Sequence, residues 1–307
     1  MLLMFLPENE EYTVFLPFKF RIDSKAAKQR REMNMVNHLS WGRLVFVFPV
    51  FFSALLVVAQ ERHEKKETYT VGPRAILTVV NDCGPITVRS SRTGKVLVTM
   101  VWHALAVEFI NEQHGDRLDL RAKSDSSGAN LAEYTVLVPT AEMVTIRSPQ
   151  GNVFVQGVSG DVALETSSSP ITISDVADAH IKARSLSGSI KISEVHQSHV
   201  DLYSVKGDIQ LHNVGSSWLE GHSSTGKITY DGDPGMGEYK LFSQFGDLEV
   251  SIPSAAKADI KARSFKSDQD IHVPEMSHPN SFLKSQNQNA SRFKLRSLRG
   301  DIRVTRP

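Results

Sequence analysis

Short runs of alternating apolar and polar residues recur along the second half of the chain at intervals of about 19 residues. Each unit has the form Φ-x-Φ-x-S-x-x-G-x-Φ-x-Φ, where Φ is usually apolar, as in IKARSLSGSIKI (181–192) and VDLYSVKGDIQL (200–211). Because alternation places every second side chain on one face, this pattern predicts two short strands around a tight corner. The predicted turn glycines, expected to have positive φ, are Gly151, Gly188, Gly207, Gly226, Gly246 and Gly300.

The short unit length predicts how the units pack. A unit of this size cannot bury its own apolar face, so it must stack on its neighbours. The expected fold is therefore all-β, a parallel β-helix-like β-solenoid with about 4.8 Å between coils. A serine ladder lies three residues before the glycines, with the parity of the inward positions, and its hydroxyls are expected to satisfy turn amides. Its members are Ser148, Ser185, Ser204, Ser223, Ser243 and Ser297.

The repeats also suggest domain boundaries. Longer alternating runs at 68–138 predict that residues 60–142 form an N-terminal β portion that starts the sheets and covers one end of the stack. A partial copy of the unit occurs within it at 77–88. Residues 143–307 hold the solenoid repeats, including a degenerate coil at 258–273. We expect residues 60–307 to form one continuous domain.

An uncharged apolar run, LVFVFPVFFSALLVVA, occupies residues 44–59 and follows Arg43. A basic start, an apolar middle and small residues before Gln60 are typical of a secretory signal peptide, here residues 33–59. A retained membrane anchor is the alternative, although sixteen residues fall short of the roughly 20 that a spanning helix needs. Since Met33 or Met35 would begin a conventional signal peptide, residues 1–32 are interpreted as an upstream extension. The protein is then exported to the periplasm, the outer surface or the medium.

Composition narrows the chemistry. The chain has 35 Lys+Arg against 34 Asp+Glu, a net charge of +1, which argues against nucleic acid as the partner. The single cysteine, Cys83, excludes an intramolecular disulfide framework and a cysteine-based zinc site. No cofactor motif and no G-x-S-x-G element occurs, so no catalytic residue is assigned.

The chain resembles a known family in three places: AILTVVNDCGPITV (75–88), the stretch from YTVLVPTAEMVTIRS to SSSPITI (134–173), and the serial S-x-x-G-D-I-x-V units. These resemble the bacterial "putative adhesin" domain-of-unknown-function family over about residues 68–305. The resemblance implies an exported, single-stranded β-solenoid without an established active site. It therefore supplies no catalytic residues.

Two sets of outward residues are candidate sites. His180 and His199 occupy equivalent positions in adjacent coils, and His196 lies close by, so these imidazoles are candidate metal ligands. The alternative is a solvated turn with chance register. An outward column of cationic and aromatic residues is a candidate binding face for an envelope polymer, a glycan or a protein, the alternative being an ordinary solvated face. This column contains Arg184, Tyr203, His222, Phe242, Arg263 and Arg296.

These features favour a non-enzymatic cell-envelope protein with an adhesin-like, scaffolding or binding role. A polysaccharide-active β-helix enzyme is the alternative, since Asp201 and Glu220 are in register and such chemistry needs paired carboxylates. Assembly into filaments through the solenoid ends is a third hypothesis, which the basic C-terminal stretch 257–307 argues against.

Overall fold

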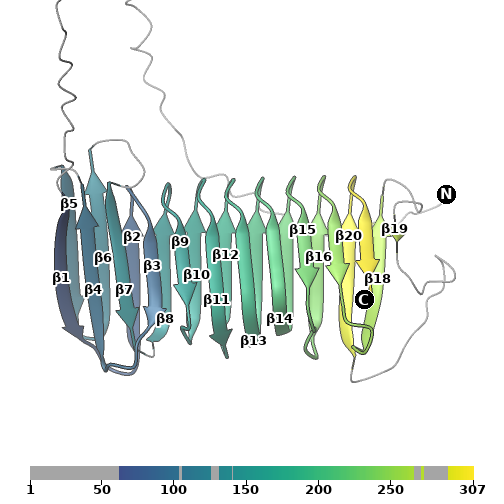
Figure 1. Cartoon of the computed structure of the whole chain (residues 1–307), viewed down its shortest axis with the longest axis horizontal. Coiled ribbons are helices and arrows are strands. Elements are labelled where there is room, and N and C mark those ends of the chain that lie inside the picture. Colours follow the sequence, from purple (N-terminus) through teal and green to yellow (C-terminus); the bar gives the residue numbers. More distant parts are fainter. Residues whose placement is uncertain (1–61, 104–105, 126–130, 140, 266–270, 273–289) are drawn as a thin grey trace, which may run out of the picture. The chain divides into compact units, whose positions relative to one another are not determined.

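The computed structural model describes residues 62–103, 106–125, 131–139, 141–265, 271–272 and 290–307, all within one compact unit, Val57–Pro307. These residues form 21 strands and no helix, and the predicted all-β solenoid is confirmed (Figure 1). Accordingly, none of the described residues belongs to a helix long and apolar enough to cross a membrane. The predicted upstream extension (1–32) and export segment (33–59) lie outside the described residues.

Successive coils stack as two sheets, which we call sheet 1 and sheet 2, before and after the S-x-x-G corner respectively. Sheet 1 of the repeats contains β8 (Ala141–Ser148), β10 (Asp161–Thr166), β12 (His180–Ser185), β16 (Glu238–Ser243), β18 (Ala258–Ser264) and β20 (Ser291–Ser297). Sheet 2 contains β9 (Val153–Gln156), β11 (Ile171–Ala177), β15 (Ile228–Asp231), β17 (Leu248–Ser251), β19 (Ile271–His272) and β21 (Ile302–Thr305). Two 15-residue strands, β13 (Ile190–Ser204) and β14 (Ile209–Ser223), run through both sheets.

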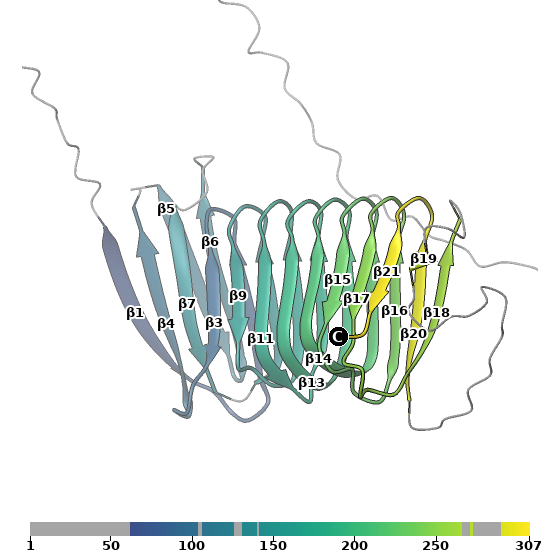
Figure 2. The same cartoon turned by 45° about the vertical axis from the view of Figure 1, so that its right-hand side comes forward.

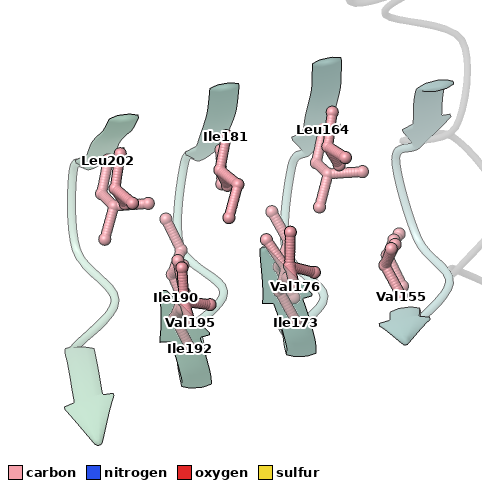
Figure 3. Close-up of a cluster of buried hydrophobic side chains, with 14 of the residues drawn as sticks. Val155, Leu164, Ile173, Val176, Ile181, Ile190, Ile192, Val195 and Leu202 are labelled. Carbon is pink, nitrogen blue, oxygen red and sulfur yellow. The ribbon is translucent and has the colours of Figure 1, made fainter. Parts of the chain in front are cut away.

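The core is a thin layer between the two sheets. The strands pair in parallel and in register, so that Ile181 lies beside Val200 and Ile190 beside Ile209. Figure 3 shows the aliphatic side chains that both sheets direct inward, among them Ile181 and Ile192, which are fully buried. Since full burial of one such side chain stabilises by about 1.5–3 kcal/mol, stacking supplies what a single coil cannot.

The glycines of the S-x-x-G corner are needed for close approach between coils. None of the six has positive φ, so that part of the prediction is wrong. Instead, a Cβ atom on Gly207 would lie 2.1 Å from the carbonyl oxygen of Gly188, and one on Gly226 would lie 2.2 Å from that of Gly207. Each corner therefore packs its backbone directly on the preceding corner, which leaves no room for a side chain.

The serines of the ladder are buried, and their hydroxyls form hydrogen bonds within the S-x-x-G corners. The Ser223 hydroxyl accepts a hydrogen bond from the Gly226 amide at 2.9 Å, and Ser243 and Ser297 do the same three residues before their glycines. Ser148 also donates to the carbonyl of Gly84 in the adjacent coil at 3.0 Å. Ser204 differs, because its buried hydroxyl has no hydrogen-bond partner within the described part of the chain.

The opposite corner of each coil contains left-handed backbone. Asp175, Glu194 and Asn213 have φ of 56°, 53° and 52°, and Gly157 and Gly232 occupy the equivalent places in neighbouring coils. The side chains stack there too, since Asn213 Nδ2 donates to Glu194 Oε2 at 2.7 Å. The alternation of apolar residues does not reveal this corner, although its 18–19-residue spacing is visible in the sequence.

The N-terminal strands enter the stack out of sequence order. They are β1 (His63–Thr70), β2 (Ala75–Asn81), β3 (Ile86–Ser90), β4 (Lys95–Trp102), β5 (Val107–His114), β6 (Arg117–Ser124) and β7 (Ala132–Val138). The coil β2–β3 pairs in parallel with β8–β9 on one side and with β6–β7 on the other. Antiparallel strands β5, β4 and β1 then continue the sheets, as Figure 2 shows.

Aromatic side chains fill the space between these antiparallel strands. Trp102 packs on Phe109 with ring centroids 5.2 Å apart, and Phe109 packs edge-on against Tyr134 at 5.6 Å. Beside them, Asn111 accepts a hydrogen bond from Tyr134 and donates one to Glu67, which also accepts from Tyr69. These four polar side chains are thus hydrogen-bonded to one another.

The last two coils stack in the reverse of their sequence order. β20 pairs with β16 on one side and with β18 on the other, and β21 lies between β17 and β19 (Figures 1 and 2). The last coil in the sequence is therefore the last but one in space. The degenerate coil expected at 258–273 lies outside it, at the end of the described stack.

Candidate functional site

Register places the predicted binding residues in one column on the outer face of sheet 1. In space the column runs Arg184, Tyr203, His222, Phe242, Arg296 and Arg263. The exchange of the C-terminal coils reverses the last two relative to the sequence. Neighbours in such a column stand about 4.8 Å apart, so their side chains act as one strip.

The strip is partly aromatic at its centre. The ring of His222 lies 5.6 Å from that of Phe242, while Tyr203 is 48% exposed in spite of its size. His222 Nε2 is 2.7 Å from Glu220 Oε1, which fixes the imidazole on its own strand. The strip therefore presents apolar rings beside charged groups, a combination that binding surfaces favour.

Six cations cluster where β16, β20 and β18 adjoin. This basic patch consists of Lys240, Lys261, Arg263, Arg292, Lys294 and Arg296. Two acidic residues, Glu238 and Asp259, share the same outer face, so the patch carries an excess of positive charge. Equivalent residues stand about 4.8 Å apart across strands and alternate residues about 6.6 Å apart along them, which gives a flat grid of charges.

Only part of the patch is neutralised. Lys294 forms an ion pair with Glu238, and this hydrogen bond holds the pKa of that carboxyl below its usual value. Lys240 lies 3.8 Å from the ring centroid of Trp218 and 3.8 Å from Glu238. Among the described residues, Arg292 and Arg296 form no ion pair and are exposed, which leaves their charges available to a ligand.

Two exposed phenylalanines border the basic patch just beyond the ends of β16 and β18. Phe265 is 57% exposed with the Arg263 guanidinium 4.7 Å above its ring, and Phe245 is 45% exposed with Arg299 at 5.2 Å. The repeat pattern gave no reason to select these positions. Their size and exposure in the structure are the signal that identifies them.

The structure brings His180 and His199 together and adds Asp201, which the sequence had paired with Glu220 as a candidate enzyme carboxylate and had not assigned to the histidine group. Their rings are 4.7 Å apart, and both face Asp201, with Nε2–carboxylate distances of 3.4 and 3.7 Å. One ligand atom from each of the three residues lies within 4.8 Å of the others. His196 is exposed at the opposite corner and is not part of this group.

The carboxylates relevant to an enzyme are already engaged. Asp201 and Glu220 lie side by side on β13 and β14, but Asp201 faces two histidines and Glu220 is bound by His222. On sheet 2, a groove of about 430 Å³ is lined in part by Glu194, His212 and Asp231. There, His212 Nδ1 is 3.0 Å from Asp231, and Glu194 accepts from an asparagine.

The comparisons with known proteins agree with this architecture. A family model described as Toastrack DUF4097 matches residues 77–305. A "putative adhesin" from Bacteroides fragilis is 14% identical with a TM-score of 0.50, over 81% of this chain and 99% of that one. A "putative adhesin" from Parabacteroides distasonis is 11% identical with a TM-score of 0.40, over 79% and 97%. No curated protein sequence matches the chain. The first structure shows a shared fold.

Proposed function

The chain belongs to the Toastrack DUF4097 family, and we propose that it is a non-enzymatic, adhesin-like protein that binds an acidic polysaccharide. The family match confirms the predicted resemblance to the "putative adhesin" family. The basic patch is the observation that carries this proposal. Its cations lie on a flat, exposed sheet face, where a linear polymer can meet several of them at once. The name of the Bacteroides fragilis structure, "putative adhesin", supports an adhesin-like role.

A linear anionic ligand fits this patch better than a compact one. The cations repeat along the stacking direction at the coil spacing, so a polymer lying across the strands meets a new charge at each coil. Phe242 and the bordering Phe265 offer apolar faces next to those charges. Since exposed ionic contacts are screened by salt, the binding is expected to weaken steeply as ionic strength rises.

The test is binding of the full-length chain to a glycan array that includes acidic polysaccharides, followed by affinity measurements at several salt concentrations. The double variant Arg292→Ala/Arg296→Ala removes two charges from the patch. We expect it to lower the affinity roughly tenfold, because each exposed ionic contact contributes up to about 1 kcal/mol. The matched control is Lys191→Ala/Lys206→Ala, which removes two exposed charges elsewhere. Equal losses in both variants would show a net-charge effect and no site.

The polysaccharide-active enzyme remains the alternative. Hydrolysis of a glycosidic bond requires one carboxylic acid and one carboxylate on opposite sides of the bond. Release of new reducing ends from a bound polysaccharide by the wild-type chain, lost in Glu194→Gln, would favour it. Binding without cleavage supports the adhesin-like role.

Export and domain organisation belong to the same proposal. We infer that residues 33–59 direct export and are cleaved before Gln60, with membrane anchoring through 44–59 as the alternative, and that 60–307 form the mature domain. Mass spectrometry of the native N-terminus tests this directly. A terminus at Gln60 supports cleavage, a terminus at Met33 or Met35 supports anchoring, and any peptide from 1–32 refutes the upstream extension.

A further inference from the structure

We propose that His180, His199 and Asp201 form a binding site for a divalent transition-metal ion such as Zn²⁺ or Cu²⁺. The three residues lie on the outer face of β12 and β13, and one ligand atom of each lies within 4.8 Å of the other two. Imidazole nitrogen and carboxylate oxygen together are a donor set suited to these ions.

The distances fit a small coordination sphere. Metal–ligand bonds of about 2.0–2.1 Å in tetrahedral geometry place neighbouring donor atoms roughly 3.3 Å apart. His180 Nε2 lies 3.4 Å from one oxygen of Asp201, and His199 Nε2 lies 3.7 Å from the other. All three side chains are 36–47% exposed, so small rotations can close the remaining gap and water can complete the sphere.

Solenoid register is what creates this site. His180 and His199 are partners across the parallel ladder, which aligns two imidazoles with no loop in between. Asp201 is two residues beyond His199 on the same face and so completes the triangle. Asp201 lies between Lys182 on β12 and Glu220 on β14. A cation and an anion therefore flank the site, and their charges offset each other.

A histidine–carboxylate pair on sheet 2 provides a matched control. His212 and Asp231 are 3.0 Å apart on sheet 2, but no second histidine joins them among the described residues. A pair of this kind has two protein ligands, against three in the proposed site. His212→Ala should therefore leave metal binding unchanged.

Isothermal titration of the full-length chain with Zn²⁺ is the test. We expect binding that His180→Ala or Asp201→Asn weakens at least about tenfold, since each removes one of three ligands. Circular dichroism checks that the variants stay folded, which these exposed positions favour. If the wild-type chain shows no Zn²⁺ binding, or if both variants bind as well as wild type, the histidines only hydrogen-bond Asp201 and the proposal is wrong.

Tryptophan fluorescence gives an independent readout. The ring of Trp218 lies 5.8 Å from that of His199, so Cu²⁺ bound at the site should quench Trp218. His180→Ala keeps this ring contact and should still reduce the quenching at a fixed Cu²⁺ concentration. In Trp218→Phe the quenching should disappear with Zn²⁺ binding intact. Quenching that persists in Trp218→Phe would place the copper elsewhere. Neither result depends on whether the basic patch binds polysaccharide.

Discussion

The corner glycines allow a sharp test of how the coils pack, and Gly207→Ala is the most direct substitution. Gly207 is buried and has a φ that other residues adopt, so the added methyl group acts through space alone. Its Cβ atom would lie 2.1 Å from the carbonyl oxygen and 2.5 Å from the carbonyl carbon of Gly188. Both atoms belong to the backbone of the preceding coil, so no side chain can move aside.

The cost follows from the hydrogen bonds that join these two corners. Relief of the contact requires the coils to separate by about an ångström, the difference from an ordinary van der Waals distance. Three backbone hydrogen bonds cross the corner at 2.8–3.2 Å, from the amides of Ile190, Val205 and Lys206 to the partner coil. At about 1 kcal/mol each, their disruption lowers the free energy of unfolding by ~3 kcal/mol.

Guanidinium unfolding monitored by circular dichroism measures this loss. Gly94→Ala is the control, because Gly94 is exposed, has no positive φ and would place its methyl group in open space. We expect that control to be neutral or slightly stabilising, as a less flexible unfolded chain predicts. If the two variants unfold at the same denaturant concentration, the corners do not pack backbone to backbone and the explanation for the S-x-x-G pattern fails.

Three further predictions concern polar groups that are buried or partly buried. Ser223→Ala should lower the free energy of unfolding by about 1 kcal/mol in the same assay, because it removes a hydrogen bond to a corner amide. Ser204→Ala should be neutral or stabilising, because the Ser204 hydroxyl has no hydrogen-bond partner in the described chain. Equal effects of the two substitutions would contradict this reasoning. Burial, together with its hydrogen bond to Glu67, raises the pKa of Tyr69 to about 12. Since this folded-state pKa exceeds the unfolded-state pKa near 10, the protonated Tyr69 hydroxyl contributes fully to stability below pH 10, and this contribution is lost as the pH rises towards 12. The measurement is an absorbance titration of tyrosinate, and a Tyr69→Phe variant that loses no high-pH transition would refute the prediction. Burial also raises the pKa of the Cys83 thiol, so iodoacetamide should label it only after unfolding, and rapid labelling of the folded chain would contradict its buried position.

The sequence predicted part of the proposed metal site and missed the rest. The interval of 19 residues was enough to pair His180 with His199, because register in a parallel stack follows from the repeat length. It did not select Asp201 as the third member, since a carboxylate two residues away is informative only once the ring orientations are known. It assigned His196 to the group, whereas the bend between the sheets places that side chain at another corner.

The repeat pattern by itself determined the solenoid fold, the inward positions and the buried serine ladder, because all three depend on local alternation and on the spacing of one unit. Only the tertiary structure decided the order of the coils at both ends. Every coil offers the same strand edges, so the backbone pattern does not say which coil docks on which. Side-chain fit makes that choice: Phe293 stacks on Tyr239 at 4.5 Å and is fully buried between two coils. The coil of β18, with the small and partly buried Ala258 and Ala262, tolerates the end position, and the exchange places the three cations of β20 in the middle of the basic patch.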